Sequence, residues 1–199
     1  MKLIPNLQEQ VASHLRRRIF SGQLAPGTPF REQLLAEEFG VSRGPIRDAL
    51  LTLTKEGLLH ARPNIGVRVA EEPAAFKRAV IVRLRREIES SAMGAWFETM
   101  DQGLLTGFGA NLADYRQACG GTDFGQVVEL DMAFHRLLVE FPDGGSLVDV
   151  WLPVISRMYL RHSRHRVLMD SYYEHQAIVS AMQAGDKNKA VELLMHHIV

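Results

Sequence analysis

Histidine is concentrated in the C-terminal third of this 199-residue sequence, in a pattern that suits metal binding. Six of the eight histidines lie between residues 131 and 199. Asp131 and His135 are four positions apart, so on a helix both side chains leave the same face about one turn apart. The flanking Leu130, Phe134 and Leu138 are expected to face a core. A carboxylate and an imidazole buried beside them need a partner, because burying either group alone is costly.

Two further histidines complete a candidate ligand set. His175 and His197 each fall in phase with apolar residues on later expected helices. Three helices would then deliver one carboxylate and three imidazoles to one point, a set suited to zinc, nickel, manganese or iron. The competing interpretation of Asp131 and His135 is a buried hydrogen-bonded pair without a metal ion.

The other C-terminal histidines are interpreted as structural. His162 and His165 stand in an arginine-rich segment, residues 157–166, and His196 directly precedes His197. The segment is interpreted as a solvated face, a docking surface for the N-terminal part of the chain, or a source of cations for an anionic ligand. The single cysteine, Cys119, has no catalytic partner nearby in the sequence.

A helix that begins near Ser42 carries side chains suited to reading DNA. The Ser42 hydroxyl can cap free amides, and Pro45 sits in the first turn, where its missing N–H costs nothing. Arg43 and Arg47 project from the leading end. In a helix-turn-helix the N-terminal residues of the second helix meet base edges, and arginine bonds guanine with two hydrogen bonds. This helix is therefore predicted to read DNA.

The elements around this helix agree with that prediction. A preceding helix has Leu34, Leu35 and Phe39 on its inner side and stops at Gly40, which tolerates the left-handed backbone of a helix end. Periodicity predicts two more elements, a helix over residues 7–20 and a short hairpin, or wing, over residues 60–70. The competing interpretation is a plain three-helix bundle with solvated arginines.

Charge is distributed unevenly along the chain, although the formal net charge is zero. Residues 1–70 hold ten Lys or Arg against six Asp or Glu, whereas residues 71–199 hold thirteen against seventeen. Positive charge is thus concentrated where the DNA-reading motif lies. Arg16, Arg17 and Arg18, near the end of the first helix, are interpreted equally as solvent-exposed or as phosphate contacts.

The rest of the chain is predicted to be a six-helix, all-α bundle. The boundary falls near residues 70–73, which divides the chain into domains of residues 1–70 and 71–199. The expected helices cover residues 74–100, 104–119, 123–141, 146–165, 168–184 and 186–199. No apolar run of 18 residues and no signal-like N-terminus are found, so we expect a cytoplasmic protein that does not enter membranes. The fold class is mainly α, with a small β hairpin in the N-terminal winged helix-turn-helix.

The first 70 residues resemble the winged-helix domain of GntR-family bacterial transcription regulators. The matching residues are 19–22, 24–27, Arg31-Glu32, 40–43, 45–47, Ala49-Leu50, Leu53, 56–58 and Gly66. In that family the residues matching Arg31, Arg43 and Arg47 touch DNA in the major groove, and the glycine matching Gly66 lets the wing tip approach the minor groove. The resemblance therefore implies DNA contacts at Arg31, Arg43, Arg47 and Gly66. Together with Ser42, Gly44 and Pro45 at the start of the DNA-reading helix, they form the predicted DNA-binding set.

The second part holds, in order, Asp131, Phe134-His135, Glu174-His175, Gly185-Asp186, Ala190, Leu194 and His197-Ile198. This order resembles the FCD effector domain of the FadR-type branch of that family, and six helices are more similar to its VanR-like subgroup. In metal-binding members the positions matching Asp131, His135, His175 and His197 hold the ion, and a small carboxylate effector binds against it. Arg85 and Glu89 match an Arg-x-x-x-Glu pattern whose arginine reaches the effector pocket.

We therefore expect a sequence-specific, DNA-binding transcription regulator, a repressor by the habit of the family, that acts as a homodimer on an inverted-repeat operator. A small organic acid bound at the metal and Arg85 would shift the arrangement of the winged domains. One alternative is a regulator for which the ion itself is the signal. Another is a metal-dependent enzyme, because open coordination positions also activate water. No nucleophile or general base accompanies the ligands in the sequence, so an enzyme is not predicted.

Overall fold

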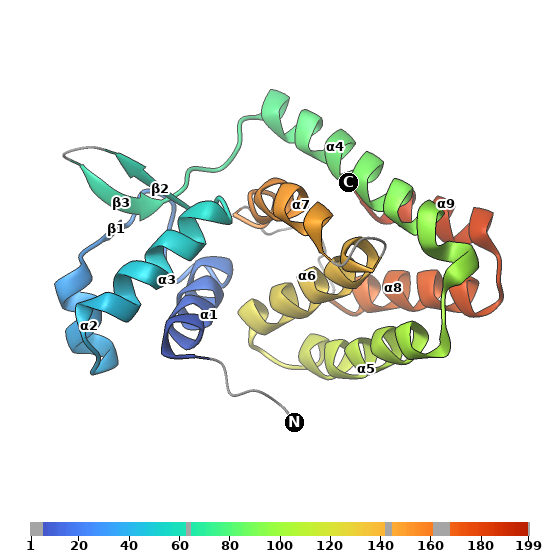
Figure 1. Ribbon diagram of the computed structural model, residues 1–199, viewed down its shortest axis with the longest axis horizontal. Coiled ribbons are helices and arrows are strands. Elements are labelled where there is room, and N and C mark those ends of the chain that lie inside the picture. Colours follow the sequence, from blue (N-terminus) through green and yellow to red (C-terminus); the bar gives the residue numbers. More distant parts are fainter. Residues whose placement is uncertain (1–5, 63–64, 142–144, 161–167, 199) are drawn as a thin grey trace.

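The computed structural model describes residues 6–62, 65–141, 145–160 and 168–198 of the chain. Figure 1 shows a small winged unit on one side and a helical bundle on the other, with α1 and α7 at the boundary between them. The predicted fold class is confirmed, because the described residues form mostly helices with one small antiparallel sheet. His162, His165 and the wing residues 63–64 lie outside the described residues.

The winged unit contains the three predicted helices and a sheet. Its helices are α1 (Leu7–Phe20), α2 (Glu32–Phe39) and α3 (Arg43–Lys55), and its strands are β1 (Pro29–Phe30), β2 (Leu59–Arg62) and β3 (Gly66–Val69). The strands are antiparallel in the order β1-β3-β2, so the predicted hairpin gains an edge strand. Only two residues form that strand, too few to show the alternation by which strands are predicted.

The core of the winged unit follows the predicted faces with one exception. Leu15 of α1 and Ile46 and Leu53 of α3 are fully buried, as helical spacing requires. Leu34 was predicted to face inward, but the structure leaves it 56% exposed. The buried residues of α2 are Leu35 and Ala36, so Leu34 lies about 150° away from the centre of the buried face.

Every described element after the wing is helical, as predicted. The bundle contains α4 (Ala75–Trp96), the 3₁₀ turn η1 (Phe97–Thr99), α5 (Gln102–Cys119), α6 (Phe124–Glu140), α7 (Ser146–Ser156), α8 (Leu168–Gln183) and α9 (Lys187–His197). Asp101, Asp123 and Asp186 cap α5, α6 and α9, each accepting a hydrogen bond from the backbone three residues later. None of the described helices combines the length and apolar character needed to cross a membrane.

Two helices end earlier than the apolar pattern predicts. The helix expected to reach residue 100 tightens into η1 after Trp96. The helix expected to reach residue 165 ends at Ser156, where the amides of Met158 and Tyr159 bond to carbonyls three residues back instead of four. Met158 and Tyr159 are still buried, which explains why the apolar pattern continues beyond the helix.

The winged unit packs on the bundle mainly through α1 and α6. Glu129 of α6 accepts hydrogen bonds from Ser13 at 3.2 Å and from Arg17 at 2.6 Å. The backbones also approach closely, because a Cβ built on Gly125 would lie 2.8 Å from the Arg17 carbonyl oxygen. A second contact places Gly57, just after α3, against the backbone of Pro153 in α7.

Gly125→Ala tests the closeness of this packing. The added methyl group would meet backbone atoms that cannot rotate away, so we expect a loss of about 1 to 3 kcal/mol in the free energy of unfolding. Gly109→Ala is the matched control, because α5 leaves open space around Gly109 and alanine should stabilise that helix by about 0.5 to 1 kcal/mol. Urea denaturation measures both, and a Gly125→Ala variant at least as stable as the wild type would contradict the packing.

Candidate metal centre and DNA-reading surface

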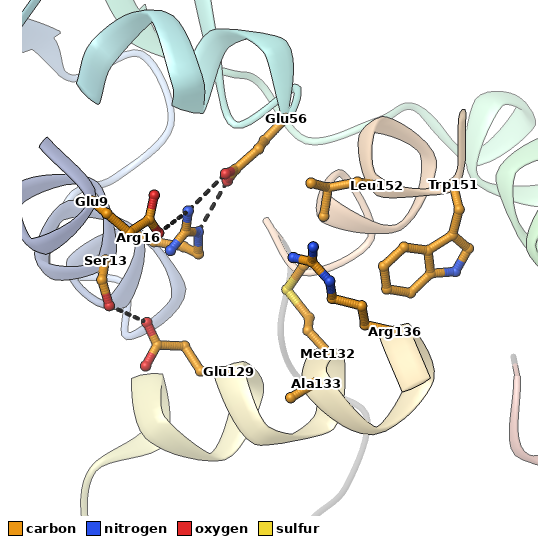
Figure 2. A pocket seen from close by; sticks show the side chains of 10 residues that line it. All are labelled: Glu9, Ser13, Arg16, Glu56, Glu129, Met132, Ala133, Arg136, Trp151 and Leu152. Atoms are coloured by element: carbon orange, nitrogen blue, oxygen red, sulfur yellow. Dashed lines mark hydrogen bonds and ion pairs between the residues drawn. The ribbon is translucent and has the colours of Figure 1, made fainter. Parts of the chain in front are cut away.

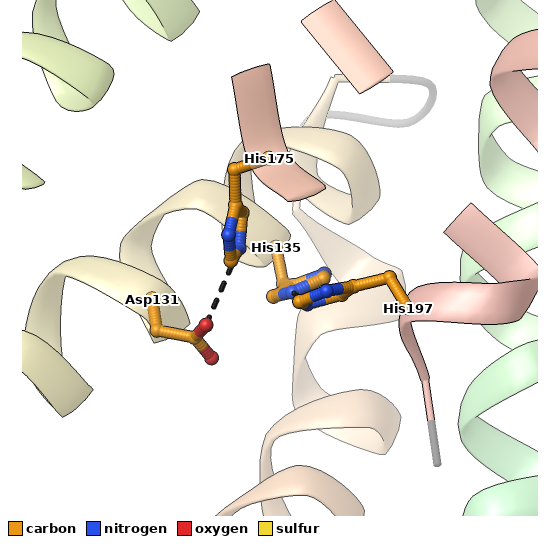
Figure 3. A group of neighbouring side chains, drawn as sticks. All are labelled: Asp131, His135, His175 and His197. Carbon is orange, nitrogen blue, oxygen red and sulfur yellow. Dashed lines mark hydrogen bonds and ion pairs between the residues drawn. The ribbon is translucent and has the colours of Figure 1, made fainter. Parts of the chain in front are cut away.

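The structure brings together the four residues that the sequence suggested as metal ligands. Asp131 and His135 come from α6, His175 from α8 and His197 from α9, and Figure 3 shows their side chains converging. All four residues are buried, and one potential ligand atom from each lies within 4.8 Å of the others. Three helices distant in sequence thus meet at one polar point inside an otherwise apolar bundle.

The outer nitrogen of each imidazole faces an acceptor. His175 Nδ1 donates to the Ser171 carbonyl at 2.7 Å, and His197 Nδ1 donates to the Glu174 carboxylate at 2.6 Å. His135 Nδ1 lies 2.8 Å from Glu89 Oε2, although its N–H is not well aligned on that oxygen. With the proton on Nδ1, each neutral ring turns an Nε2 lone pair toward the centre, the arrangement typical of histidines that bind metals.

These lone pairs crowd one another in a way that a cation would relieve. His135 Nε2 and His197 Nε2 are 3.1 Å apart. Two nitrogens bonded to one ion at about 2.0 to 2.1 Å are separated by roughly that distance. His175 Nε2 lies 3.3 Å from Asp131 Oδ1 and makes no well-formed hydrogen bond to any described atom. The donor set therefore fits a metal ion.

A shared proton is the competing way to relieve the crowding, and burial opposes it. A proton between two rings would make one of them an imidazolium. His135 is fully buried, and burial, the largest influence, lowers its pKa despite the nearby Glu89. The imidazole is therefore held neutral, as a metal ligand must be.

The fourth member of the group, Asp131, is held as an anion. Burial alone would raise the pKa of its carboxyl, but contact with His175 and electrostatic attraction to the three imidazoles bring the pKa well below its usual value. Tyr115 and Tyr159 both donate hydroxyl hydrogen bonds to this carboxylate. No spacing in the sequence indicated either tyrosine, because they come from α5 and from the turn after α7.

Arg85 and Glu89 of α4 lie next to the four candidate ligands, on the side of the His135 Nδ1 atom. Arg85 Nε donates to Glu89 Oε1 at 2.7 Å, and the Trp151 indole donates to the same oxygen at 2.7 Å. Burial would raise the pKa of Glu89, but the charge of Arg85 and the interactions with His135 and Trp151 lower it to about 2. Arg85 Nη2 is buried and has no hydrogen-bond partner among the described atoms. One cationic nitrogen beside the centre thus remains able to bind an anion.

Five of the seven predicted DNA-reading residues lie on the helix-turn-helix formed by α2 and α3. Gly40 ends α2 with φ of 66°, the left-handed conformation predicted for the turn. Arg43 and Arg47 are exposed at the start of α3, and Arg43 Nη2 donates to Glu32 Oε2 at 3.0 Å. Ser42 is the N-cap residue as predicted, but its hydroxyl makes no capping hydrogen bond. Gly44 and Pro45 form the first turn.

The other two members of the predicted set flank that helix-turn-helix. Arg31 is exposed directly before α2, and Gly66 is exposed at the start of β3 with φ of 85°. Arg16, Arg17 and Arg18, for which two interpretations were open, make ion pairs with Glu56, Glu129 and Glu38, and Arg17 is also exposed to solvent. His196 is exposed on α9, away from the buried group.

Comparison with known proteins identifies the chain's family. A model of bacterial regulatory proteins of the gntR family matches residues 7–69, and an FCD domain model matches residues 80–199. The chain belongs to the gntR family. This FCD-domain member is 34% identical to an uncharacterized HTH-type transcriptional regulator, YdhC of Bacillus subtilis, over 94% of the chain and 86% of that relative.

Other similar proteins agree with a gntR-family transcription regulator. A probable D-xylose utilization operon transcriptional repressor of Paenarthrobacter nicotinovorans is 27% identical over 95% of the chain and 84% of its own length. The structure of E. coli McbR/YncC has the same fold, with a TM-score of 0.79 and 24% identity over 98% of this chain and 94% of that one. The gntR family consists of regulatory proteins, and both sequence relatives are named as transcriptional regulators or repressors.

Zinc should stabilise the chelator-treated protein if the four side chains bind it. An ion that binds only the folded chain adds about 2.7 kcal/mol at a hundredfold excess over Kd. Thermal unfolding with and without zinc measures this shift. His175→Gln should abolish the shift, whereas His196→Gln, the exposed histidine beside His197, should retain it. Equal shifts in both variants would contradict the assignment.

Proposed function

We propose that this gntR-family regulator is a repressor whose operator binding is controlled by a small carboxylate bound at a metal ion in the FCD domain. The ion would be held by Asp131, His135, His175 and His197. In this proposal residues 1–70 form the DNA-binding domain and residues 71–199 the effector-binding domain, of the FadR type and VanR-like subgroup. The observation that carries it is the meeting of four buried ligands beside an unpaired guanidinium nitrogen.

The chemistry of that site supports an anionic effector. Four protein ligands would hold zinc, nickel, manganese or iron, and an ion that prefers more than four ligands would leave positions for oxygen atoms of an effector. Arg85 Nη2 is buried close by without a hydrogen bond in the described part of the chain, and a buried cationic group gains most from a charged partner. A carboxylate could bind the ion through one oxygen and Arg85 through the other.

The winged unit supports reading of base edges. Arg43 and Arg47 extend from the exposed start of α3, and the ion pair with Glu32 holds the Arg43 guanidinium in position. Arg31 and Gly66 are exposed at the two flanks of that helix-turn-helix. The excess of basic residues over acidic ones in residues 1–70 favours the approach to phosphates.

A homodimer is part of the proposal, and α4 offers a surface for a second copy. Phe76 is 78% exposed and Leu84 is 47% exposed on this long helix, and Val80 lies between them one turn from each. Apolar residues exposed in a row favour association. Two copies related by a twofold axis would present two α3 helices to an inverted repeat.

The first test is selection of bound duplexes from a randomised DNA pool by the purified protein at near-physiological salt. Recovery of a short inverted repeat would support a sequence-specific dimeric regulator. Adding and removing zinc in the same selection separates a metal-responsive regulator, in which the ion is the signal, from one in which a carboxylate is needed. Failure to enrich any sequence under both conditions would contradict the proposal and favour the enzyme alternative.

Arg47→Ala should reduce affinity for the selected operator by about 1 to 3 kcal/mol and relax the preference at one base pair, because a bidentate contact to guanine is lost. Binding to random duplex should change much less. Arg83→Ala removes an exposed arginine from α4 of the bundle and should change neither affinity. Gel-shift titrations with operator and random DNA measure the difference, and an equal loss on both duplexes would argue against base reading.

Phe76→Glu should weaken the proposed dimer, since it places a carboxylate in the apolar row on each copy. Sedimentation equilibrium should show a dimer for the wild type and a dissociation constant raised at least tenfold for the variant. Tyr173→Glu, at another exposed aromatic position on α8, should leave the association unchanged. A Phe76→Glu protein that dimerises as tightly as the wild type would exclude this surface.

A further inference from the structure

We infer that Glu89 is a positioning residue of the proposed metal centre, and that its hydrogen bond to Trp151 connects occupancy of the centre with the boundary between bundle and winged unit. This inference rests on the proposed function, because it assumes that the group around His135 binds an ion. It concerns residues that do not touch the ion themselves.

The Glu89 carboxylate serves three donors from three helices. Its Oε1 accepts from Arg85 and from Trp151, and its Oε2 faces His135 Nδ1. The side chain is completely buried, so water does not replace any of these partners. Only a carboxylate accepts on both sides, whereas an amide would present an NH₂ group either to His135 or to Arg85 and Trp151.

This arrangement determines which nitrogen of His135 can bind the ion. A carboxylate oxygen beside Nδ1 favours the tautomer with its proton there, which leaves Nε2 free for the metal. An amide NH₂ beside Nδ1 would favour the opposite tautomer and place a proton on Nε2. Glu89 therefore prepares His135 for metal binding without contacting the metal.

Trp151 extends the contact to the surface of the bundle that faces the winged unit. Its ring lines a cavity of about 530 Å³ that is also lined by Arg16 of α1, Glu56 after α3 and Glu129 of α6 (Figure 2). Trp151 lies on α7, two residues before Pro153. The backbone of Pro153 contacts Gly57, which lies two residues after the end of α3. Helix α7 thus contacts Glu89, which lies behind His135, and Gly57, which follows α3 of the winged unit.

Metal binding should therefore change the hydrogen bond between the Trp151 indole and Glu89. An imidazole that donates its Nε2 lone pair to a cation becomes a stronger Nδ1–H donor, so its interaction with Glu89 strengthens. The same carboxylate accepts the indole N–H of Trp151 at 2.7 Å. A stronger interaction of Glu89 Oε2 with His135 draws charge away from Oε1 and so alters the hydrogen bond that Oε1 accepts from Trp151.

The first arm of the test measures zinc affinity by competition with a chromophoric chelator. Glu89→Gln should bind zinc about 10- to 100-fold more weakly than the wild type, the usual effect of losing a group that orients a metal-binding histidine. Glu87→Gln, an exposed position on the same helix, should bind like the wild type. Wild-type affinity in Glu89→Gln would overturn the inference, whereas a wild type that binds no metal ion would overturn the proposed centre and this inference with it.

The second arm uses the two tryptophans of the chain as matched reporters, and it remains informative if Glu89→Gln does not fold. Both indoles are buried and donate hydrogen bonds of 2.7 Å, Trp151 to Glu89 and Trp96 to the Leu138 carbonyl. In Trp96→Phe, which keeps Trp151, zinc should change the fluorescence emission until the centre is saturated. In Trp151→Phe, which keeps Trp96, zinc should leave the emission unchanged. An equal response in both variants, or none from Trp151 while zinc binds, would overturn the inference.

Discussion

The interaction on which this structure depends is the convergence of three imidazole nitrogens and one carboxylate inside an apolar bundle. Such groups are costly to bury unless each one is paired. The outer nitrogens of His175 and His197 are paired with Ser171 and Glu174, but the inner lone pairs face one another. The helices α6, α8 and α9 are therefore held together at a point that favours a cation, and the apolar core surrounds that point.

Helix α6 has two functional faces, and this follows from helical geometry. Residues two positions apart are turned by about 200°, so Asp131 and Glu129 leave opposite sides of the helix. Asp131 and His135 point into the bundle, whereas Gly125 and Glu129 contact α1 of the winged unit. Any displacement of α6 that adjusts the ligands also acts on the contact with α1, because a packed helix moves as one body.

The features of the fold that depend on residues close together in the sequence could be predicted from local patterns. The bounds of α1, the turn at Gly40 and the inward side of Asp131 and His135 all follow from spacing and from the conformational preference of glycine. Partners far apart in the sequence could not be predicted. Trp151 meets Glu89 from 62 positions away, and nothing in the spacing of either residue indicates that contact.

Another contact that was not predicted, between Arg17 and Glu129, connects the two parts of the chain. The sequence neighbours of Arg17 suggest solvent exposure or a phosphate contact; Arg17 is exposed, and it also pairs with Glu129, 112 positions later. A basic residue near a DNA-binding motif has two possible partners, phosphate or a carboxylate of the same chain, and sequence composition does not distinguish them. A DNA phosphate near Arg17 would have to compete with Glu129 for this arginine, and the competition would depend on how firmly α1 is held against α6. Packing between the winged unit and the bundle would then influence how much positive charge the winged unit offers to phosphates.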